Sequence, residues 1–207
     1  MIGLAVAMIS AYLLGSFPSA YVAGLLVKGI DIREHGSGNI GASNVFRVVG
    51  KKWGILVLVI DILKGFIAVA VIASFCHAHQ AIFAKLPYGL IVGIAAIAGH
   101  NWTVFLKFRG GKGVATSLGV ALALLPKAAL SALCVWILVL IPFGYISVSS
   151  LVAAASFPFW IFFWYRLVAG FLPIFAMSVL VSILIVYTHR SNIQRLKQGK
   201  EAKVWHK

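Results

Sequence analysis

Acidic residues are scarce in this chain. Four Asp and Glu stand against 18 Lys and Arg in 207 residues, which gives a formal net charge of +14. Only 11% of the residues are charged, and 62% are hydrophobic. A soluble protein of this size needs polar residues to cover its core, so the composition argues against a soluble domain. We expect residues 1–207 to form one all-α integral membrane domain.

Cysteine is nearly absent as well. Cys76 and Cys134 lie far apart without metal-type spacing, so we expect no disulfide framework and no metal site, and nothing indicates a cofactor. No cation precedes Lys28. The first apolar block therefore lacks the basic start of a cleaved signal peptide and is expected to be a retained helix.

Long apolar runs take up most of the chain. A membrane helix needs about 20 apolar residues, so these runs predict a helical bundle of about seven spans, some of them short. The expected spans are residues 2–27, 53–75, 88–98, 114–125, 128–141, 151–164 and 168–188. Polar turns are expected at 76–87 and 142–150, and a kink or close packing around Pro18. A five-span alternative merges the short segments between 114 and 164 and leaves both chain ends on the same sides.

Cationic residues cluster at the ends of these apolar runs. Most fall on one side of the predicted membrane, and Lys and Arg typically mark cytoplasmic loops. We therefore expect an N-terminus outside and a cytoplasmic C-terminus, with membrane lipids rather than nucleic acid as partners. Asp61 and Lys64 lie inside the second span at i, i+3 spacing, and a buried ion pair is the favoured interpretation.

One polar stretch, GHNWTVFLKFRGGKGVAT at residues 99–116, interrupts two short apolar segments. Its glycines allow a ligand to approach backbone N–H groups, and a helix starting near Val114 would point its N-terminus at the same place. Lys107, Arg109 and Lys112 add positive charge. The nucleoside-triphosphatase pattern GxxxxGK[ST] is not met, because Gly113 follows Lys112. The stretch predicts a phosphate-binding loop; the alternative is a simple cationic loop with glycine turns.

Two further polar stretches fall on the same predicted side of the membrane. The first, residues 36–52, contains Asn44 and Arg47 at i, i+3 spacing, which would share a helix face. The second, residues 188–201, contains His189 and Asn192 at the same spacing. Turn chemistry and a surface histidine are the simpler interpretations of each stretch alone. Together the three stretches predict a cytoplasmic-side active site.

The three motifs in this order carry a family resemblance. SGNIGASN at 37–44, the stretch at 99–116, and HRSN at 189–192 followed by Glu201 resemble the acyl-phosphate:glycerol-3-phosphate acyltransferases, the bacterial PlsY family. The resemblance covers nearly the whole chain. Ser43 stands where the family usually has Thr, a conservative departure.

The resemblance implies transfer of a fatty acyl group from acyl phosphate to the 1-hydroxyl of sn-glycerol 3-phosphate. The products would be 1-acyl-sn-glycerol 3-phosphate (lysophosphatidic acid) and phosphate, in the first acylation step of phospholipid synthesis. A transient contact with the soluble enzyme that forms acyl phosphate is a further implied partner. The H-x-x-x-x-D signature of acyltransferases that use acyl-CoA or acyl-carrier protein is missing, since Asp31 and Asp61 are the only aspartates.

Residue roles follow the same resemblance. It makes Glu201 a structural acid. The expected catalytic residues are Ser37, Arg47, His189 and Asn192. The expected substrate-binding residues are Asn39, Asn44, His100, Asn101, Lys107, Gly110, Gly111, Lys112, Gly113, Ser147, Ser149 and Ser150, with no choice made among the three serines.

Two questions stay open at the level of sequence. The proton of the glycerol hydroxyl can pass to His189 or to the phosphate of the donor, and the lack of an evident carboxylate–histidine pair favours the donor phosphate. A transporter of a phosphate-bearing anion is the alternative function, because it also needs broken spans and cations. A transporter would place polar residues at the membrane midplane or outside, whereas these are mostly on the cytoplasmic side.

Overall fold

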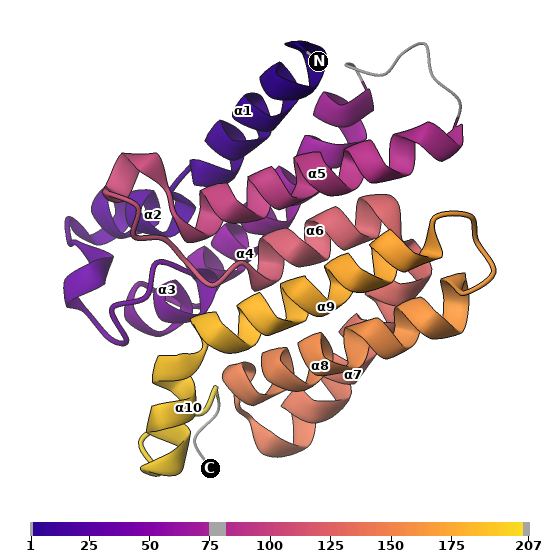
Figure 1. Cartoon of the computed structure of the whole chain (residues 1–207). Helices are drawn as coiled ribbons and strands as arrows, with labels where there is room; N and C mark the ends of the chain where they lie inside the picture. Colours follow the sequence, from indigo (N-terminus) through magenta and orange to yellow (C-terminus); the bar gives the residue numbers. More distant parts are fainter. Residues whose placement is uncertain (1, 75–81, 205–207) are drawn as a thin grey trace. The chain divides into compact units, whose positions relative to one another are not determined.

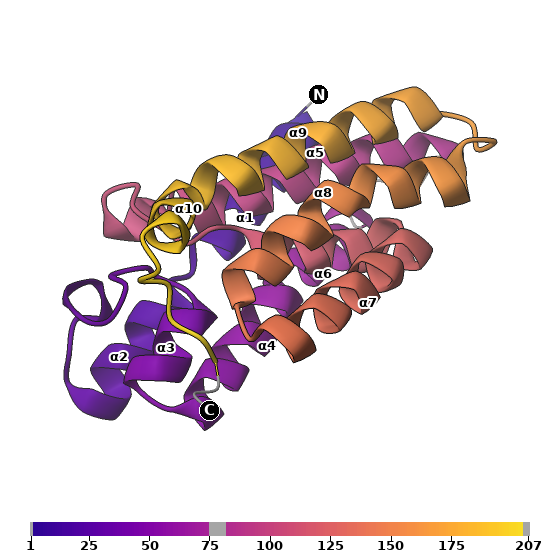
Figure 2. The ribbon, with the colours of Figure 1, turned by 90° about the horizontal axis from the view of Figure 1, so that it is seen from below.

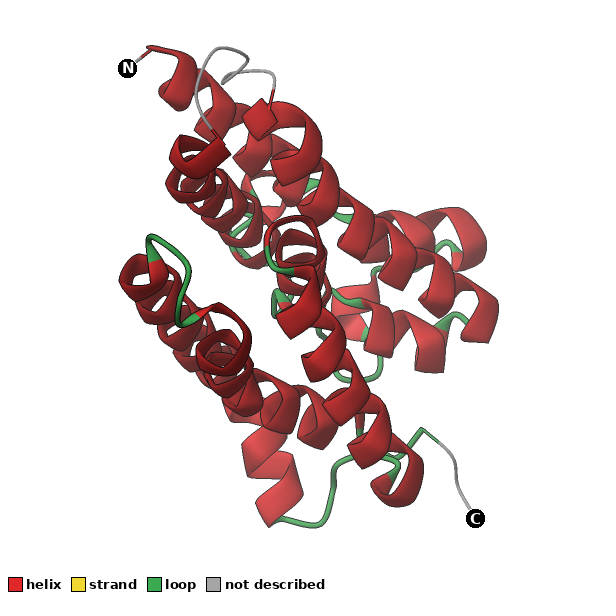
Figure 3. Cartoon of the chain, turned by 90° about the vertical axis from the view of Figure 1, so that its right-hand side faces the viewer, coloured by secondary structure: helices red, strands yellow, loops and turns green. Residues whose placement is uncertain are grey.

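The computed structural model describes residues 2–74 and 82–204, and within those ranges the regular structure is helical throughout (Figure 3). Six described helical segments are long and apolar enough to cross a membrane, and the first of them, Gly3–Lys28, contains a break at residues 17–18. A further apolar helix, Val114–Leu124, is shorter. The all-α membrane fold is therefore confirmed. The five-span alternative is wrong, because three separate helices occupy the region from 114 to 164. Cys76 and the first part of the predicted turn at 76–87 lie outside the described residues.

The chain divides into two compact units, residues 1–124 and 125–207. Each is described by itself, and the expectation of one functional domain over the whole chain stays a prediction. In the first unit α1 packs along α5, and α4 packs along α6 (Figure 1). Its helices are α1 (Ile2–Ser16), α2 (Ser19–Lys28), α3 (Ala42–Val48), α4 (Lys51–Ile67) with a π-helical continuation (Ala68–Ala73), α5 (Ile82–Asn101) and α6 (Val114–Leu124).

The first predicted span is broken where proline occurs. Helix α1 ends at Ser16, and α2 begins after Pro18. Close packing accompanies the break, because a methyl group on Gly15 would overlap the carbonyl of Ala96 in α5. The expected kink and close packing around Pro18 are both confirmed.

The third predicted span, 88–98, was too short. Helix α5 runs from Ile82 to Asn101, so residues 82–87 of the predicted turn are helical and Pro87 does not end the helix. Proline is tolerated in membrane helices where neighbouring segments compensate for the lost hydrogen bond. Helix α6 has 11 residues, as expected for an undersized segment.

The second unit contains α7 (Pro126–Phe143), α8 (Ile146–Tyr165), α9 (Phe171–Thr188) and α10 (Arg190–Lys197). Helix α8 packs against α7 and α9 (Figure 2). The predicted inner turn at 142–150 is wrong: only Gly144 and Tyr145 separate α7 from α8. Gly144 makes this short connection possible, because its φ of 74° is a left-handed conformation that suits glycine.

Candidate active site

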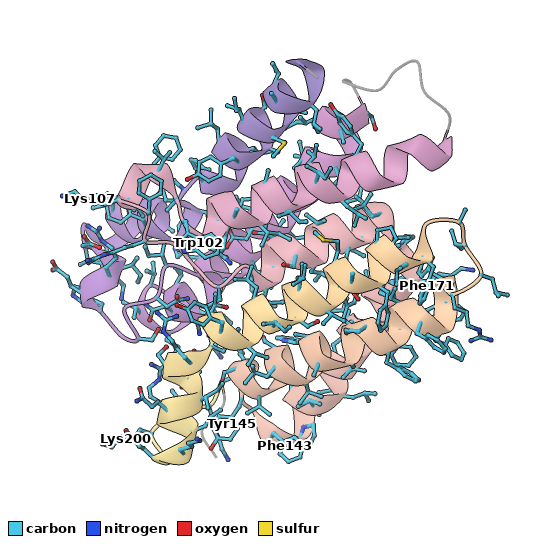
Figure 4. All side chains as sticks on the ribbon, viewed as in Figure 1. Trp102, Lys107, Phe143, Tyr145, Phe171 and Lys200 are labelled. Carbon is cyan, nitrogen blue, oxygen red and sulfur yellow. The ribbon has the colours of Figure 1, made fainter. Side chains whose placement is uncertain are left out.

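The glycine-rich stretch is a loop that closes on the end of the helix before it. After α5 the chain makes a 3₁₀ turn at Val104–Leu106, and Lys107 follows with a φ of 54°. Lys107 is exposed and lies at the outer end of the loop (Figure 4). The chain then returns: the N–H of Gly110 donates to the carbonyl of Asn101 (3.1 Å), and the N–H of Gly111 donates to the carbonyl of His100 (3.0 Å).

These two hydrogen bonds change the role expected of the glycines. The amides of Gly110 and Gly111 satisfy carbonyls in the last turn of α5, which leaves them engaged rather than open to a ligand. Both glycines are packing positions. A methyl group on Gly110 would overlap the carbonyl of His100, and one on Gly111 would overlap the His100 ring and lie 2.7 Å from the carbonyl oxygen of Ile40. Larger residues would therefore push the loop away from α5.

Three residues at the end of α5 and the start of α6 have buried polar side-chain atoms without a hydrogen-bond partner. Asn101 is 5% exposed, and neither its amide nitrogen nor its amide oxygen has a hydrogen-bond partner. Its side chain faces Gly113, since a methyl group there would lie 2.6 Å from the Asn101 Oδ1. The hydroxyls of Thr116 and Ser117, in the first turn of α6, are also buried without a partner. Helix N-termini carry unsatisfied N–H groups and a partial positive charge, so this place suits an anion.

The first polar stretch is held together by one side chain. The Oδ1 of Asn44, a residue 1% exposed, accepts from the N–H of Ser37 (2.9 Å). Its Nδ2 donates to the carbonyls of Ile32 (3.2 Å) and His35 (3.0 Å). The amide of Asn44, expected to touch substrate, is thus used to shape the loop that presents Ser37.

The first two polar stretches come together in the structure. Arg47 lies one helical turn after Asn44 on α3, as their spacing predicted. The N–H of Asn39 lies 3.5 Å from the Ser37 hydroxyl, so it also belongs to this loop. The carbonyl of Ile40 packs against Gly111 of the glycine-rich loop. Arg47 and Lys112 each take part in an interaction.

In the second unit, Glu201 ties the tail to two helices. Its Oε1 accepts from the Ser147 hydroxyl of α8 (2.8 Å) and from the Asn192 Nδ2 of α10 (2.7 Å). Its Oε2 accepts from the Arg195 Nε (2.8 Å). Burial raises the pKa of this carboxyl, but the hydrogen bonds from Asn192, Arg195 and Ser147 together outweigh burial, and its pKa lies below the ordinary value. Glu201 is therefore charged at neutral pH, and the geometry fits the structural role expected of it.

His189 and the remaining serines also lie in this unit. The Nδ1 of His189, which is 2% exposed, lies 2.7 Å from the carbonyl of Ile185. A carbonyl only accepts, so this nitrogen carries the proton and Nε2 is the acceptor nitrogen of the ring. Ser149 donates to the carbonyl of Tyr145 (2.9 Å), and Ser150 accepts from the Trp136 indole (3.2 Å). Of the three serines, Ser147 alone bonds to a predicted site residue.

Some polar residues had not been singled out from the sequence. Ser19 donates to the Asp61 carboxylate at 2.7 Å, and Thr116 and Ser117 bring hydroxyls to the start of α6. A Thr-Ser pair directly after a glycine-rich loop, at the start of an apolar helix, was the available signal. The expected meeting of the 188–201 stretch with the first two stretches stays a prediction.

The described residues define a class of protein: an α-helical integral membrane protein whose glycine-rich loop and buried polar side chains surround a helix N-terminus. The chain belongs to the glycerol-3-phosphate acyltransferase family, whose model matches residues 5–199. A relative from Trichlorobacter lovleyi with that name is 48% identical over 193 residues, 93% of each chain. Another from Alkaliphilus metalliredigens is 40% identical over 199 residues, 96% of this chain and 95% of its own.

Solved structures agree with this assignment. Two crystal structures of PlsY, described as an integral membrane glycerol 3-phosphate acyltransferase, are similar to this chain. The glycerol 3-phosphate form has a TM-score of 0.81 at 38% identity and covers 98% of this chain and 96% of its own. The lysophosphatidic acid form has a TM-score of 0.80 at 40% identity and covers 97% and 94%. The family resemblance of the polar stretches is thereby confirmed.

Proposed function

We propose that this chain transfers a fatty acyl group to the 1-hydroxyl of sn-glycerol 3-phosphate and that its donor is acyl phosphate. The relatives' names and the glycerol 3-phosphate and lysophosphatidic acid forms of PlsY support the acceptor. The donor rests on the resemblance of the three motifs. The products are 1-acyl-sn-glycerol 3-phosphate and phosphate. The reaction takes place at the cytoplasmic face of the inner membrane, where the predicted topology puts most cations.

The observation that carries this proposal is the group of unpartnered polar atoms at the start of α6. Buried polar groups nearly always have hydrogen-bond partners, so an unsatisfied cluster indicates a missing polar ligand. The Asn101 amide can donate to a phosphate oxygen, as can the hydroxyls of Thr116 and Ser117. The N-terminus of α6 adds N–H groups and positive potential. We assign the phosphate of one substrate to this place, with Lys107 and Lys112 supplying charge.

The first polar stretch supplies the groups nearest to the chemistry in this proposal. Asn44 fixes the backbone of Ser37, whose hydroxyl orients the glycerol hydroxyl, and Arg47 binds a phosphate. Holding both substrates in a reactive geometry replaces much of the entropy cost of their encounter. Inorganic phosphate is a good leaving group, so acid catalysis contributes little.

His189 and Asn192 are proposed to act in the same reaction, with Glu201 and Ser147 holding the segment that carries Asn192. The acceptor nitrogen Nε2 makes His189 chemically able to take the hydroxyl proton. We favour the donor phosphate as the proton acceptor, because the Nδ1 of His189 bonds to a carbonyl rather than to a carboxylate. His189 then orients substrate.

Phosphate release by purified protein tests the reaction. With acyl phosphate and glycerol 3-phosphate together, phosphate should appear together with 1-acyl-sn-glycerol 3-phosphate, and neither should form when one substrate is left out. Acyl-CoA of the same chain length is the control donor. Turnover with acyl-CoA and none with acyl phosphate contradicts the proposed donor while leaving the proposed acceptor standing.

His189→Gln tests the proton route. Gln keeps a polar side chain of similar reach but cannot act as a base at neutral pH. If the donor phosphate takes the proton, kcat falls by less than about tenfold, since general-base catalysis contributes about 10²–10⁴-fold. A loss of about 10³-fold in kcat at unchanged KM identifies His189 as the base instead.

A further inference from the structure

Four polar side chains form a buried cluster inside the candidate membrane spans of the first unit. They come from α2, α4 and α5 and are nearly inaccessible to solvent. Their exposed fractions are 5% for Ser19, 1% for Asp61, 4% for Lys64 and 8% for His100. Charged groups are costly inside a membrane, so a cluster of this kind needs partners and is a candidate for function.

Asp61 is the centre of the cluster. Its Oδ1 accepts from the Ser19 hydroxyl (2.7 Å) and lies 2.9 Å from the Lys64 ammonium. The Nδ1 of His100 lies 3.7 Å from the same oxygen, an electrostatic contact. The expected ion pair of Asp61 and Lys64 is confirmed. Asp61 also contacts Ser19 of α2 and His100 of α5, which are 42 and 39 residues away from it along the chain.

Lys64 makes a second contact, with the backbone between α1 and α2. Its ammonium donates to the carbonyl of Phe17 (3.3 Å), in the break between α1 and α2. That carbonyl precedes Pro18, where the helix interruption leaves backbone groups without their usual partners. The cluster therefore braces the broken span as well as joining α2, α4 and α5.

His100 connects the cluster to the glycine-rich loop. Its ring lies between the two, with Nδ1 towards Asp61 and Nε2 against Gly111. The carbonyl of His100 accepts from the N–H of Gly111 at 3.0 Å. The last turn of α5 is thus hydrogen-bonded to the glycine-rich loop.

We propose that Asp61, with Ser19 and Lys64, is a positioning group for the glycine-rich loop. The carboxylate fixes His100, and His100 fixes Gly111 and the entry to α6. The cluster touches no substrate in this proposal. The expected effect of the cluster on catalysis rests on the proposed phosphate role of the loop. The expected effect of the cluster on the position of the loop does not depend on that role.

Two double variants separate positioning from simple support of the fold. D61L/K64M removes both charges and the acceptor at position 61. D61N/K64M also removes both charges but keeps an oxygen that can accept from Ser19 and face His100. Replacing both members of a buried pair by groups of similar size is often nearly neutral for stability. The two variants therefore differ mainly in one acceptor atom.

Three measurements are made on each purified variant: thermal unfolding, hydrogen–deuterium exchange of the peptide covering residues 102–113, and KM for glycerol 3-phosphate. D61L/K64M should melt about 2–12 °C below D61N/K64M, because the buried Ser19 hydroxyl loses its acceptor. It should also exchange faster in that peptide and show a KM raised about tenfold, since small misplacements at a reacting site have large kinetic effects. D61N/K64M should stay near the parent protein in exchange and KM.

The outcomes are distinct. Unchanged exchange in D61L/K64M overturns the positioning proposal, whatever the KM. Equal exchange and KM in the two variants also overturns it, because the acceptor atom then has no role. Faster exchange with an unchanged KM supports positioning of the loop and contradicts the phosphate role instead. If D61L/K64M does not fold, His100→Leu replaces it: faster exchange at 102–113 supports the proposal, and unchanged exchange overturns it.

Discussion

Replacing Glu201 by Ala removes an acceptor that three donors share. Two of those donors, Ser147 and Asn192, are 4% and 5% exposed, so water cannot readily take the place of the carboxylate. Each buried donor left unsatisfied costs about 1–3 kcal/mol, and two cost about 2–6 kcal/mol. A folded domain is stable by only about 5–15 kcal/mol, so this loss is large.

Glu201→Gln is the matched control. Gln keeps a carbonyl oxygen that can accept from Ser147 and Asn192, and it loses the charge that faces Arg195. The side chain of Arg195 is 29% exposed, and partly exposed ion pairs contribute about 1 kcal/mol or less. We therefore expect the order of stability to be parent, then Glu201→Gln, then Glu201→Ala.

Thermal unfolding in detergent at pH 7 measures this order. For a chain of this size, 1 kcal/mol shifts Tm by about 2–4 °C, so Glu201→Ala should melt about 4–24 °C lower and Glu201→Gln about 4 °C lower at most. Tryptic cleavage after the exposed Lys197 should also become faster in the Ala variant as the tail is released. If Ala and Gln variants melt at the same temperature, the buried donors do not depend on this carboxylate and the reasoning fails.

Three further predictions follow from single residues. The pKa of Glu201 in the folded protein is lowered, so the stability that its carboxylate contributes is present above the ordinary carboxyl pKa and is lost as pH falls through the folded pKa. In the same unfolding assay, the parent should therefore lose more stability than Glu201→Gln when the pH is lowered below 4.5. Asn44→Ala leaves the Ser37 N–H without its acceptor and should raise KM for glycerol 3-phosphate and lower Tm. Asn44→Asp keeps that acceptor but sets a buried carboxylate oxygen against the carbonyls of Ile32 and His35, so its Tm should fall at least as far in the same unfolding assay. Gly113→Ala should lower Tm and raise KM for glycerol 3-phosphate far more than Gly170→Ala. Both glycines have a φ of 81°, but only the methyl group at 113 meets a neighbour, the Asn101 amide. If the two variants change Tm and KM equally, backbone strain alone explains both changes.

The membrane class could be read from the sequence, because hydropathy acts on each segment separately. The limits of the helices could not. Pro87 was expected in a turn but lies inside α5, and Ser147 was expected in a turn but lies in the first turn of α8. A proline or serine is compatible with either state, and packing by neighbouring helices selects between them.

The site was predicted in part. The residue types and the glycine-rich loop were evident, because phosphate chemistry needs cations, amides and close backbone approach. The substrate-binding role of Gly110 and Gly111 stays a prediction, and their amides donate to carbonyls at the end of α5. The unpartnered polar atoms are instead those of the Asn101 side-chain amide, at the end of α5.

The sequence by itself determined that this is a helical membrane protein with three polar motifs of a known acyltransferase family, since composition, run length and motif order are local properties. Only the tertiary structure decided what those polar groups bind. Ser19 meets Asp61 across 42 residues, and Ser147 meets Glu201 across 54. Hydrogen bonds require atoms within about 3 Å, and only the folded chain brings residues so distant in sequence to that separation.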